Sequence, residues 1–146
     1  MSTVAEILKS KSDPSLYSIA PTAAVLEAVQ VMAQKNIGAL LVIDAGQVVG
    51  IVTERDYARK VVLMNRSSKA TPVRDIMGSP VMFVEPGRTS EECMALMTEN
   101  RVRHLPVFDQ GKLVGLVSIG DIVKHIISDQ QFVIEQLEHY VTGQPR

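Results

Sequence analysis

Apolar residues change their spacing along the chain in a fixed order. Leu16–Ile19 is a short extended run that ends at Ala20-Pro21. Beyond it, apolar residues recur every three or four positions with polar residues between them, at Val25, Leu26, Ala28, Val29, Met32 and Ala33. This spacing places them on one face of a helix. The pattern therefore predicts a strand followed by an amphipathic helix.

Two pairs of short apolar runs then predict two β-hairpins. Each pair flanks a four-residue turn that begins with Asp and has Gly in its third position. The runs with their turns are Ala39–Ile43, Asp44–Gln47 and Val48–Val52 in the first pair, and Leu105–Phe108, Asp109–Lys112 and Leu113–Val117 in the second. Nearly every strand position is apolar, which is typical of sheets that helices cover.

Each hairpin is followed by a predicted helix, over Glu54–Met64 in the first half and from Ile119 onward in the second. The second helix carries an apolar stripe longer than its own half of the chain requires. The stripe contains Ile122, Val123, Ile126, Ile127, Val133, Ile134, Leu137 and Val141. An exposed patch of this length is uncommon on a monomer. We therefore predict a homodimer.

The chain is an internal repeat. A shift of 65 residues lays Tyr17–Val61 over Met82–Ile126 without a gap. The identical residues in the second half of this match are Val42, Asp44, Gly46, Val49, Gly50, Val52 and Asp56, which meet Val107, Asp109, Gly111, Val114, Gly115, Val117 and Asp121. Each unit is therefore predicted to run strand, helix, strand, strand, helix.

Each repeat also has a short prefix, Thr3–Leu8 in the first and Pro72–Met77 in the second, and polar residues 65–71 read as the linker. We predict a first repeat over residues 1–68 and a second over residues 69–146, with a short N-terminal helix and an extended C-terminal helix. The fold class is α/β (α+β), as a pseudo-two-fold pair.

The two copies differ at the start of their first helix. In the second copy, Thr89 and Glu92 have the spacing of a capping box, in which each side chain binds the other residue's backbone amide. The first copy has Ala24 at that position and is expected to rely on Thr22 or on water instead. The first helix of the second repeat is therefore predicted to fray less at its N-terminus than its counterpart in the first repeat.

Composition excludes several classes of protein. The chain has 146 residues, of which 46% are hydrophobic and 21% charged, which is enough apolar material for a core. Fifteen Lys and Arg balance sixteen Asp and Glu, and only 4% of residues are aromatic. The chain therefore lacks the positive field and the stacking surfaces of a nucleic-acid-binding protein. We expect no nucleic acid as a partner.

Cys93 is the only cysteine, so an internal disulfide is excluded. The apolar stretch 37–53 is interrupted by Asp44, Gly46 and Gly50, and charged residues interrupt the N-terminal region. These features predict neither a membrane span nor a signal peptide. We expect a cytoplasmic protein without a membrane partner.

Candidate chemistry lies where each hairpin runs into the following helix. The start of a helix presents unpaired N–H groups that attract an anion such as phosphate. Thr53 and Ser118 carry hydroxyls at these points, and Asp56 and Asp121 place carboxylates in the first turn, where they can accept hydrogen bonds from a ribose diol. The same Thr/Ser-x-x-Asp pattern also fits a helix cap without a ligand. Both interpretations stay open.

The paired motifs resemble a tandem of CBS repeats, the module named after cystathionine β-synthase and also called a Bateman module. The matching segments are Gly50–Asp56, Gly115–Asp121, Val73–Met77 and Arg103–Val107. The resemblance implies two clefts between the repeats, frequent dimerisation, and binding of an adenosine nucleotide such as AMP, ADP, ATP or NAD, with S-adenosylmethionine also possible. No catalytic cofactor or metal is implied.

The resemblance also suggests which residues line the sites. Arg103 matches a position that faces ligand phosphate, and the stretch between Met77 and Met82, with Ser79 and Val81, matches the adenine slot. The candidate ligand-binding residues are Gly38, Ala39, Thr53, Arg55, Asp56, Met77, Ser79, Val81, Arg103, His104, Ser118, Ile119, Gly120 and Asp121. Arg55 stands where the second repeat has Gly120, and Arg103-His104 stands where the first has Gly38-Ala39, so unequal sites are predicted.

Two functional hypotheses follow. The first is a regulatory module that senses an adenosine nucleotide and signals to a regulated protein by changing shape. The second is a protein–protein adaptor whose clefts hold no ligand. An enzyme is disfavoured, because the sequence shows no Ser/His/Asp or Cys/His set, metal-ligand cluster or P-loop.

Overall fold

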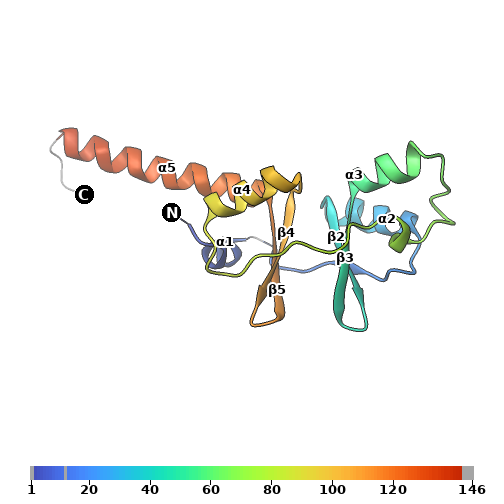
Figure 1. The fold of residues 1–146 in the computed structure, drawn as a ribbon. Helices are drawn as coiled ribbons and strands as arrows, with labels where there is room; N and C mark the ends of the chain where they lie inside the picture. Colours follow the sequence, from blue (N-terminus) through green and yellow to red (C-terminus); the bar gives the residue numbers. More distant parts are fainter. Residues whose placement is uncertain (1, 12, 143–146) are drawn as a thin grey trace. The chain divides into compact units, whose positions relative to one another are not determined.

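Two antiparallel β-hairpins carry the fold, one in each half of the chain (Figure 1). The computed structural model describes residues 2–11 and 13–142. The strands of the hairpins are β2 (Ala39–Asp44), β3 (Gln47–Thr53), β4 (His104–Asp109) and β5 (Lys112–Ser118). Both hairpins shift register at equivalent points, just after Val42 and just after Val107. The two predicted hairpins are confirmed.

The turns explain why both hairpins close in two residues. Ala45 and Gly46 have φ of 51° and 78°, and Gln110 and Gly111 have φ of 51° and 79°. Positive φ at both central residues defines the type I′ turn, whose twist matches that of the flanking strands. Glycine adopts such angles without steric cost. The Gly in each predicted turn sequence is therefore required by the backbone.

Helices α2 (Val25–Lys35) and α4 (Ser90–Asn100) occupy equivalent places in the two repeats, as predicted. At the start of α4, Thr89 Oγ1 accepts the Glu92 amide at 3.1 Å, and Glu92 Oε1 accepts the Thr89 amide at 3.2 Å. The capping box is therefore confirmed. Ala24 begins α2 without a side-chain cap, also as predicted.

The first strand of each repeat is shorter than the sequence indicates. β1 covers only Ser18–Ile19 and pairs in parallel with β2, so the first sheet has the order β1-β2-β3. In the second repeat the equivalent element is a single parallel bridge between Val84 and Val107. This bridge lies 65 residues after the Ile19–Val42 pair, so the repeat symmetry holds even where the strand is reduced.

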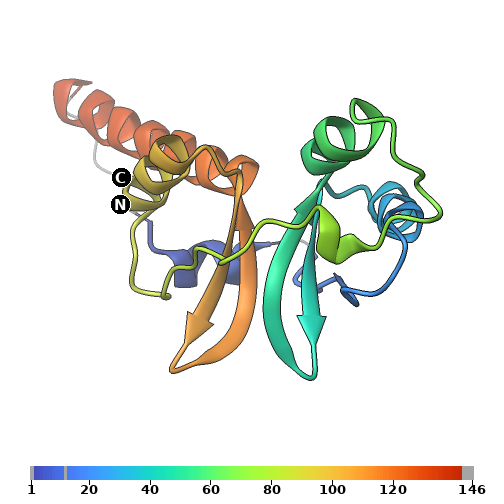
Figure 2. The same cartoon turned by 45° about the vertical axis from the view of Figure 1, so that its right-hand side comes forward.

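The closing helices differ between the repeats. α3 covers Glu54–Tyr57 and continues as a π-helical turn, Ala58–Val62, in which the Leu63 amide reaches the Ala58 carbonyl at 3.0 Å. The regular helix predicted over Glu54–Met64 is therefore corrected, because one extra residue is inserted into its hydrogen-bonding turn. In the second repeat, α5 (Ile119–Thr142) is one helix of 24 residues, which confirms the predicted extension. Figure 2 shows α3 and α5 each starting at the end of a hairpin.

Each prefix packs into the hydrophobic core of the other repeat. α1 (Val4–Ser10) contributes Val4 and Ile7 to the core under β4 and β5. A 3-10 turn, Val73–Asp75, contributes Val73 to the core under β2 and β3, and Ile76 follows it there. One compact unit is therefore Leu16–Val81, and the other combines the chain up to Ser15 with the chain from Met82 onward. The division into repeats at residue 68 stays a prediction about the duplicated sequence.

Each prefix ends with a side chain seated on a glycine of the hairpin it covers. A Cβ atom added to Gly115 would lie 2.6 Å from a methyl carbon of Leu8. A Cβ atom added to Gly50 would lie 2.5 Å from the Met77 sulfur and 3.0 Å from the Gly78 carbonyl oxygen. Real Cβ atoms do not approach this closely, so a side chain at either position would force its neighbour to move.

Gly50→Ala is expected to lower the free energy of unfolding by about 1–3 kcal/mol, because the new methyl group overlaps Met77 and presses on backbone. Gly87→Ala is the matched control, since a Cβ atom there meets nothing within 4 Å. Urea denaturation of both variants measures the difference. Equal stability of the two variants would contradict the seating of Met77 on Gly50.

Candidate functional site

The first candidate site is centred on residues Thr53–Asp56, here called the first junction, where β3 runs into α3. Thr53 and Asp56 form a reciprocal capping box: Asp56 Oδ2 accepts the Thr53 amide at 3.0 Å, and Thr53 Oγ1 accepts the Asp56 amide at 3.0 Å. The Thr53 hydroxyl also donates to Asp56 Oδ2 at 3.0 Å. The Lys60 ammonium lies 3.2 Å from Asp56 Oδ1. The carboxylate is therefore held in one orientation from both sides.

The second candidate site is centred on residues Ser118–Asp121, the second junction, where β5 runs into α5. Asp121 Oδ2 accepts the Ser118 amide at 2.9 Å, and Ser118 Oγ accepts the Asp121 amide at 3.2 Å. The cation beside this carboxylate is Lys11, whose Nζ lies 3.1 Å from the same Oδ2. Lys11 also donates to the Leu116 carbonyl at 2.8 Å. Both junctions thus combine a cap with an ion pair.

At both junctions the second amide of the helix is the one without an acceptor among the described residues. The first amides, of Glu54 and Ile119, donate to the Gly38 and Arg103 carbonyls at 3.1 and 2.8 Å. The third amides belong to the aspartates and are held by the caps. The second amide, of Arg55 or Gly120, lies in the first turn, where a helix has no internal acceptor for it. Among the described residues, it is the amide of each junction that has no acceptor, so it remains available to a ligand.

Electrostatics around the second junction favour a charged carboxylate and a neutral imidazole. Burial raises the pKa of Asp121, but the hydrogen bonds from Ser118 and the charge of the Lys11 ammonium lower it by more. The pKa of Asp121 therefore lies below its ordinary value. Burial lowers the pKa of His104, and the nearby Lys11 and Arg103 lower it too, against the opposing effect of Asp121. At neutral pH, Asp121 is therefore ionised and His104 is neutral.

The protein is expected to lose stability as the pH falls below 6.5, the ordinary pKa of a histidine such as His104. In this range His104 is protonated in the unfolded chain but stays neutral in the folded protein, so acid favours unfolding. One such proton lowers the free energy of unfolding by at most about 1.4 kcal/mol per pH unit. Denaturation at pH 7.5 and 5.5 measures this loss. His104→Gln should show a smaller loss over the same window, and an unchanged loss would contradict a neutral, desolvated His104.

The structure brings most predicted site residues together within their own units. Ala39 pairs with Thr53, and its neighbour Gly38 binds the first junction through its carbonyl. His104 pairs with Ser118, and Arg103 stands in the equivalent place beside the second junction. The side chains of Arg55 and Arg103 are exposed, and Ile119 packs partly against the core.

The predicted adenine-slot residues form a separate group in the unit Leu16–Val81. Met77 packs against Gly50, and Gly78 pairs with Ile51 through two backbone hydrogen bonds. Ser79 is exposed and Val81 is half-buried. Among the described residues, no hydrogen bond joins Ser79 or Val81 to the first junction.

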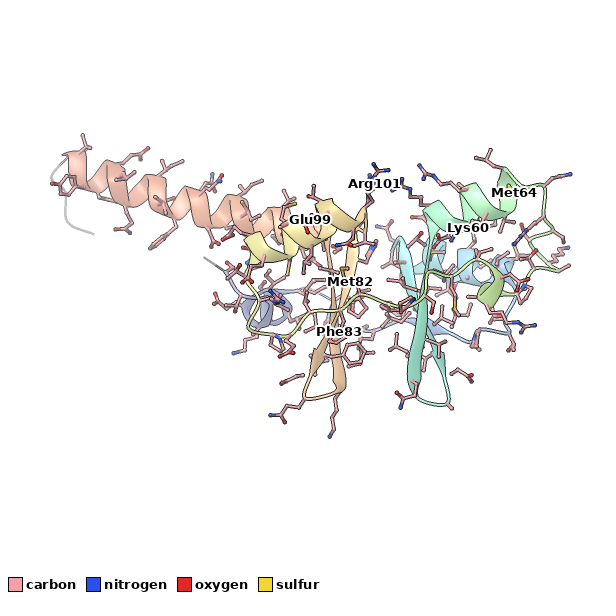
Figure 3. The ribbon with its side chains drawn as sticks, in the orientation of Figure 1. Lys60, Met64, Met82, Phe83, Glu99 and Arg101 are labelled. Atoms are coloured by element: carbon pink, nitrogen blue, oxygen red, sulfur yellow. The ribbon has the colours of Figure 1, made fainter. Side chains whose placement is uncertain are left out.

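Sequence reasoning missed both lysines that pair with the aspartates. Lys60 lies four residues after Asp56 on a helical run, a spacing at which ion pairs form, so a signal for it was present. Figure 3 labels Lys60 on the helical run after β3. Lys11 precedes the aligned part of the first repeat and reaches the second repeat only through the exchanged prefix. No local pattern could have indicated it.

Comparison with known proteins identifies the family. A family model of the CBS domain matches residues 4–63 and 73–128, so the chain belongs to the CBS-domain family. The mitochondrial CBS domain-containing protein CBSX3 of Arabidopsis thaliana is 38% identical over 149 residues, which cover 97% of this chain and 72% of that protein.

Solved structures agree with this result. A CBS-domain protein from Burkholderia ambifaria MC40-6, whose name proposes a role in signal transduction, is 59% identical and superposes with a TM-score of 0.85 over 88% of this chain and 96% of its own. The CBS domain pair of protein MJ0100, determined with 5′-methylthioadenosine and S-adenosyl-L-methionine, has a TM-score of 0.75 over 88% of this chain and 98% of its own, at 24% identity.

Paired CBS domains are regulatory, ligand-sensing modules, and the fold class predicted from the sequence is confirmed. In the described part of the chain, no helix is both long and apolar enough to cross a membrane.

Proposed function

We propose that the chain is a regulatory module that binds an adenosine-containing ligand at its two junctions and passes the signal to a partner protein by conformational change. The candidate ligands are AMP, ADP, ATP, NAD and S-adenosylmethionine. The observation that carries the proposal is the repeated junction, with an oriented carboxylate and a first-turn amide that has no acceptor among the described residues. A ribose diol and a phosphate need these two groups.

The second junction is better suited to bind a ribose than the first, because one of its carboxylate oxygens is less occupied. The Ser118 amide and the Lys11 ammonium both contact Oδ2 of Asp121. Among the described residues, Oδ1 is therefore the oxygen left for ligand hydroxyls, and the side chain is 24% exposed. At the first junction Lys60 already occupies Oδ1 of Asp56. The adenosine compounds in the MJ0100 complex support the choice of ligand class.

A thermal-shift panel of AMP, ADP, ATP, NAD, NADH and S-adenosylmethionine tests the proposal. A ligand present at 100 times its dissociation constant stabilises the folded state by about 2.7 kcal/mol. We expect at least one compound to raise the melting temperature. If none does, while a partner protein still binds, the adaptor hypothesis replaces the sensor.

The two sites are expected to have unequal affinities, because Arg55 serves only the first junction, and Arg103 and His104 serve only the second. Arg55→Ala and Arg103→Ala should each weaken ATP more than adenosine at one site. Because both side chains are exposed, the loss is nearer to threefold than to a hundredfold. Calorimetric titration with both ligands measures it. Two indistinguishable sites, or equal losses for adenosine and ATP, would show that these arginines are solvent-exposed and do not contact ligand phosphate.

We also propose that the chain forms a homodimer in the cytoplasm. Along α5 the side chains of Ile127, Ile134, Leu137 and Val141 are all more than half exposed. Soluble monomers rarely expose so continuous an apolar surface. The free thiol of Cys93 is buried, which suits a reducing compartment.

A further inference from the structure

The part of α5 beyond residue 128 lies outside the CBS-domain match, yet six of its 14 residues are hydrophobic. Apolar residues on one side of α5 are spaced alternately by four and three positions. This stripe, here called the α5 seam, consists of Val123, Ile127, Ile134, Leu137 and Val141, with Gln130 in the remaining position. A spacing of this kind is the signature of a helix that pairs with another helix.

The α5 seam does not face its own unit. Ile122 is fully buried and Ile126 packs against the core, so these residues mark the inward side of α5. Asp129, on the same side, accepts the Ser2 amide at 2.9 Å. Val123 lies about 100° around the helix from Ile122, and the apolar members of the seam are 39% to 82% exposed. Figure 1 shows the C-terminal part of α5 extending past α4.

Charge decides how a second copy can cover the seam. Residues 129–142 contain Asp129, Glu135 and Glu138 and no Lys or Arg, whereas residues 122–128, in the first half of α5, contain Lys124 and no Asp or Glu. A parallel pair would lay the two acidic segments side by side. An antiparallel pair would lay each acidic segment beside the half of the other helix that carries Lys124, and would also oppose the two helix dipoles favourably.

We propose that α5 is the interface of the homodimer and that two copies of it pair antiparallel along the seam. This inference rests on the proposed homodimer and adds its geometry. Ile127 lies against Leu137 of the second copy, and Val123 lies against Val141. On the edge of the seam, Lys124 meets Glu138 of the second copy, and two-fold symmetry forms this ion pair twice.

Charge reversal tests the pairing in the full-length protein. Lys124→Glu and Glu138→Lys each convert two attractive pairs into two repulsive ones, so each should weaken the dimer about three- to tenfold at low salt. The double variant restores both pairs and should regain the wild-type dissociation constant. Within one helix these residues are about 21 Å apart, so the rescue must act between copies. Sedimentation velocity provides the dissociation constants.

Disulfide trapping identifies the orientation independently. Ile127→Cys mixed with Leu137→Cys should form a crosslinked heterodimer on oxidation, whereas Leu137→Cys alone should not, because the two copies of that position are about 15 Å apart in the antiparallel pair. Native Cys93 is buried, and the wild-type protein serves as the control.

The outcomes separate the two proposals. Rescue by the double variant together with the heterodimer crosslink supports antiparallel pairing. Self-crosslinking of Leu137→Cys without rescue shows a parallel pair and overturns this inference, while the homodimer stands. A wild-type protein that stays monomeric at high micromolar concentration overturns both.

Discussion

Asp121→Ala is expected to lower the free energy of unfolding by about 1–3 kcal/mol and to weaken adenosine-ligand binding at the second junction ten- to a hundredfold. The stability loss follows because the Ser118 amide loses its acceptor and the Lys11 ammonium loses its carboxylate partner. The affinity loss follows because a charged carboxylate bound to hydroxyls contributes about 1.5–3 kcal/mol. Urea denaturation and calorimetric titration measure the two effects separately.

A deoxy ligand separates the capping role of Asp121 from a ribose-binding role. Wild-type protein should bind adenosine more tightly than 2′-deoxyadenosine, and Asp121→Ala should bind the two alike. Asp121→Asn is the matched control, because its side-chain oxygen still accepts the Ser118 amide while the ion pair with Lys11 is lost. A variant that loses stability but keeps the preference for adenosine would show that Asp121 is a cap alone.

Leu137→Glu is expected to convert the homodimer to monomer, with a dissociation constant raised a hundredfold or more. The substitution removes a large apolar side chain from the α5 seam and places a carboxylate there in each copy. Gln136→Glu is the control, since it adds the same charge on a different side of the same helix. Sedimentation equilibrium should find Gln136→Glu dimeric, and an equally dimeric Leu137→Glu would contradict the α5 interface.

Local patterns predicted the elements whose cause is local. The turn glycines set both hairpins, the Thr89 and Glu92 spacing sets the start of α4, and the long apolar stripe shows how far α5 extends. The same reasoning missed the π-helical turn after α3, because one extra residue in a turn leaves no trace in a helical spacing. The shortening of β1 was missed because a two-residue strand depends on its partner.

The candidate site was predictable only in part. The paired Thr/Ser-x-x-Asp motifs placed Asp56 and Asp121 correctly at the two helix starts, and the structure confirms the capping interpretation that the sequence had left open. The ion pair between Lys11 and Asp121 was not predictable, because Lys11 reaches its hairpin across 105 residues of chain through the exchanged prefix. A long-range contact of this kind leaves no signature in a single sequence.

Amide-resolved NMR titration of the full-length protein with each adenosine compound tests the central claim most directly. The account predicts chemical-shift changes at the amides of Thr53–Asp56, Ser118–Asp121 or both, with Gly120 and Arg55 among the strongest because their amides have no acceptor among the described residues. Changes at the second junction should disappear in Asp121→Ala. Titrations that leave both junctions unperturbed at millimolar ligand would contradict the account.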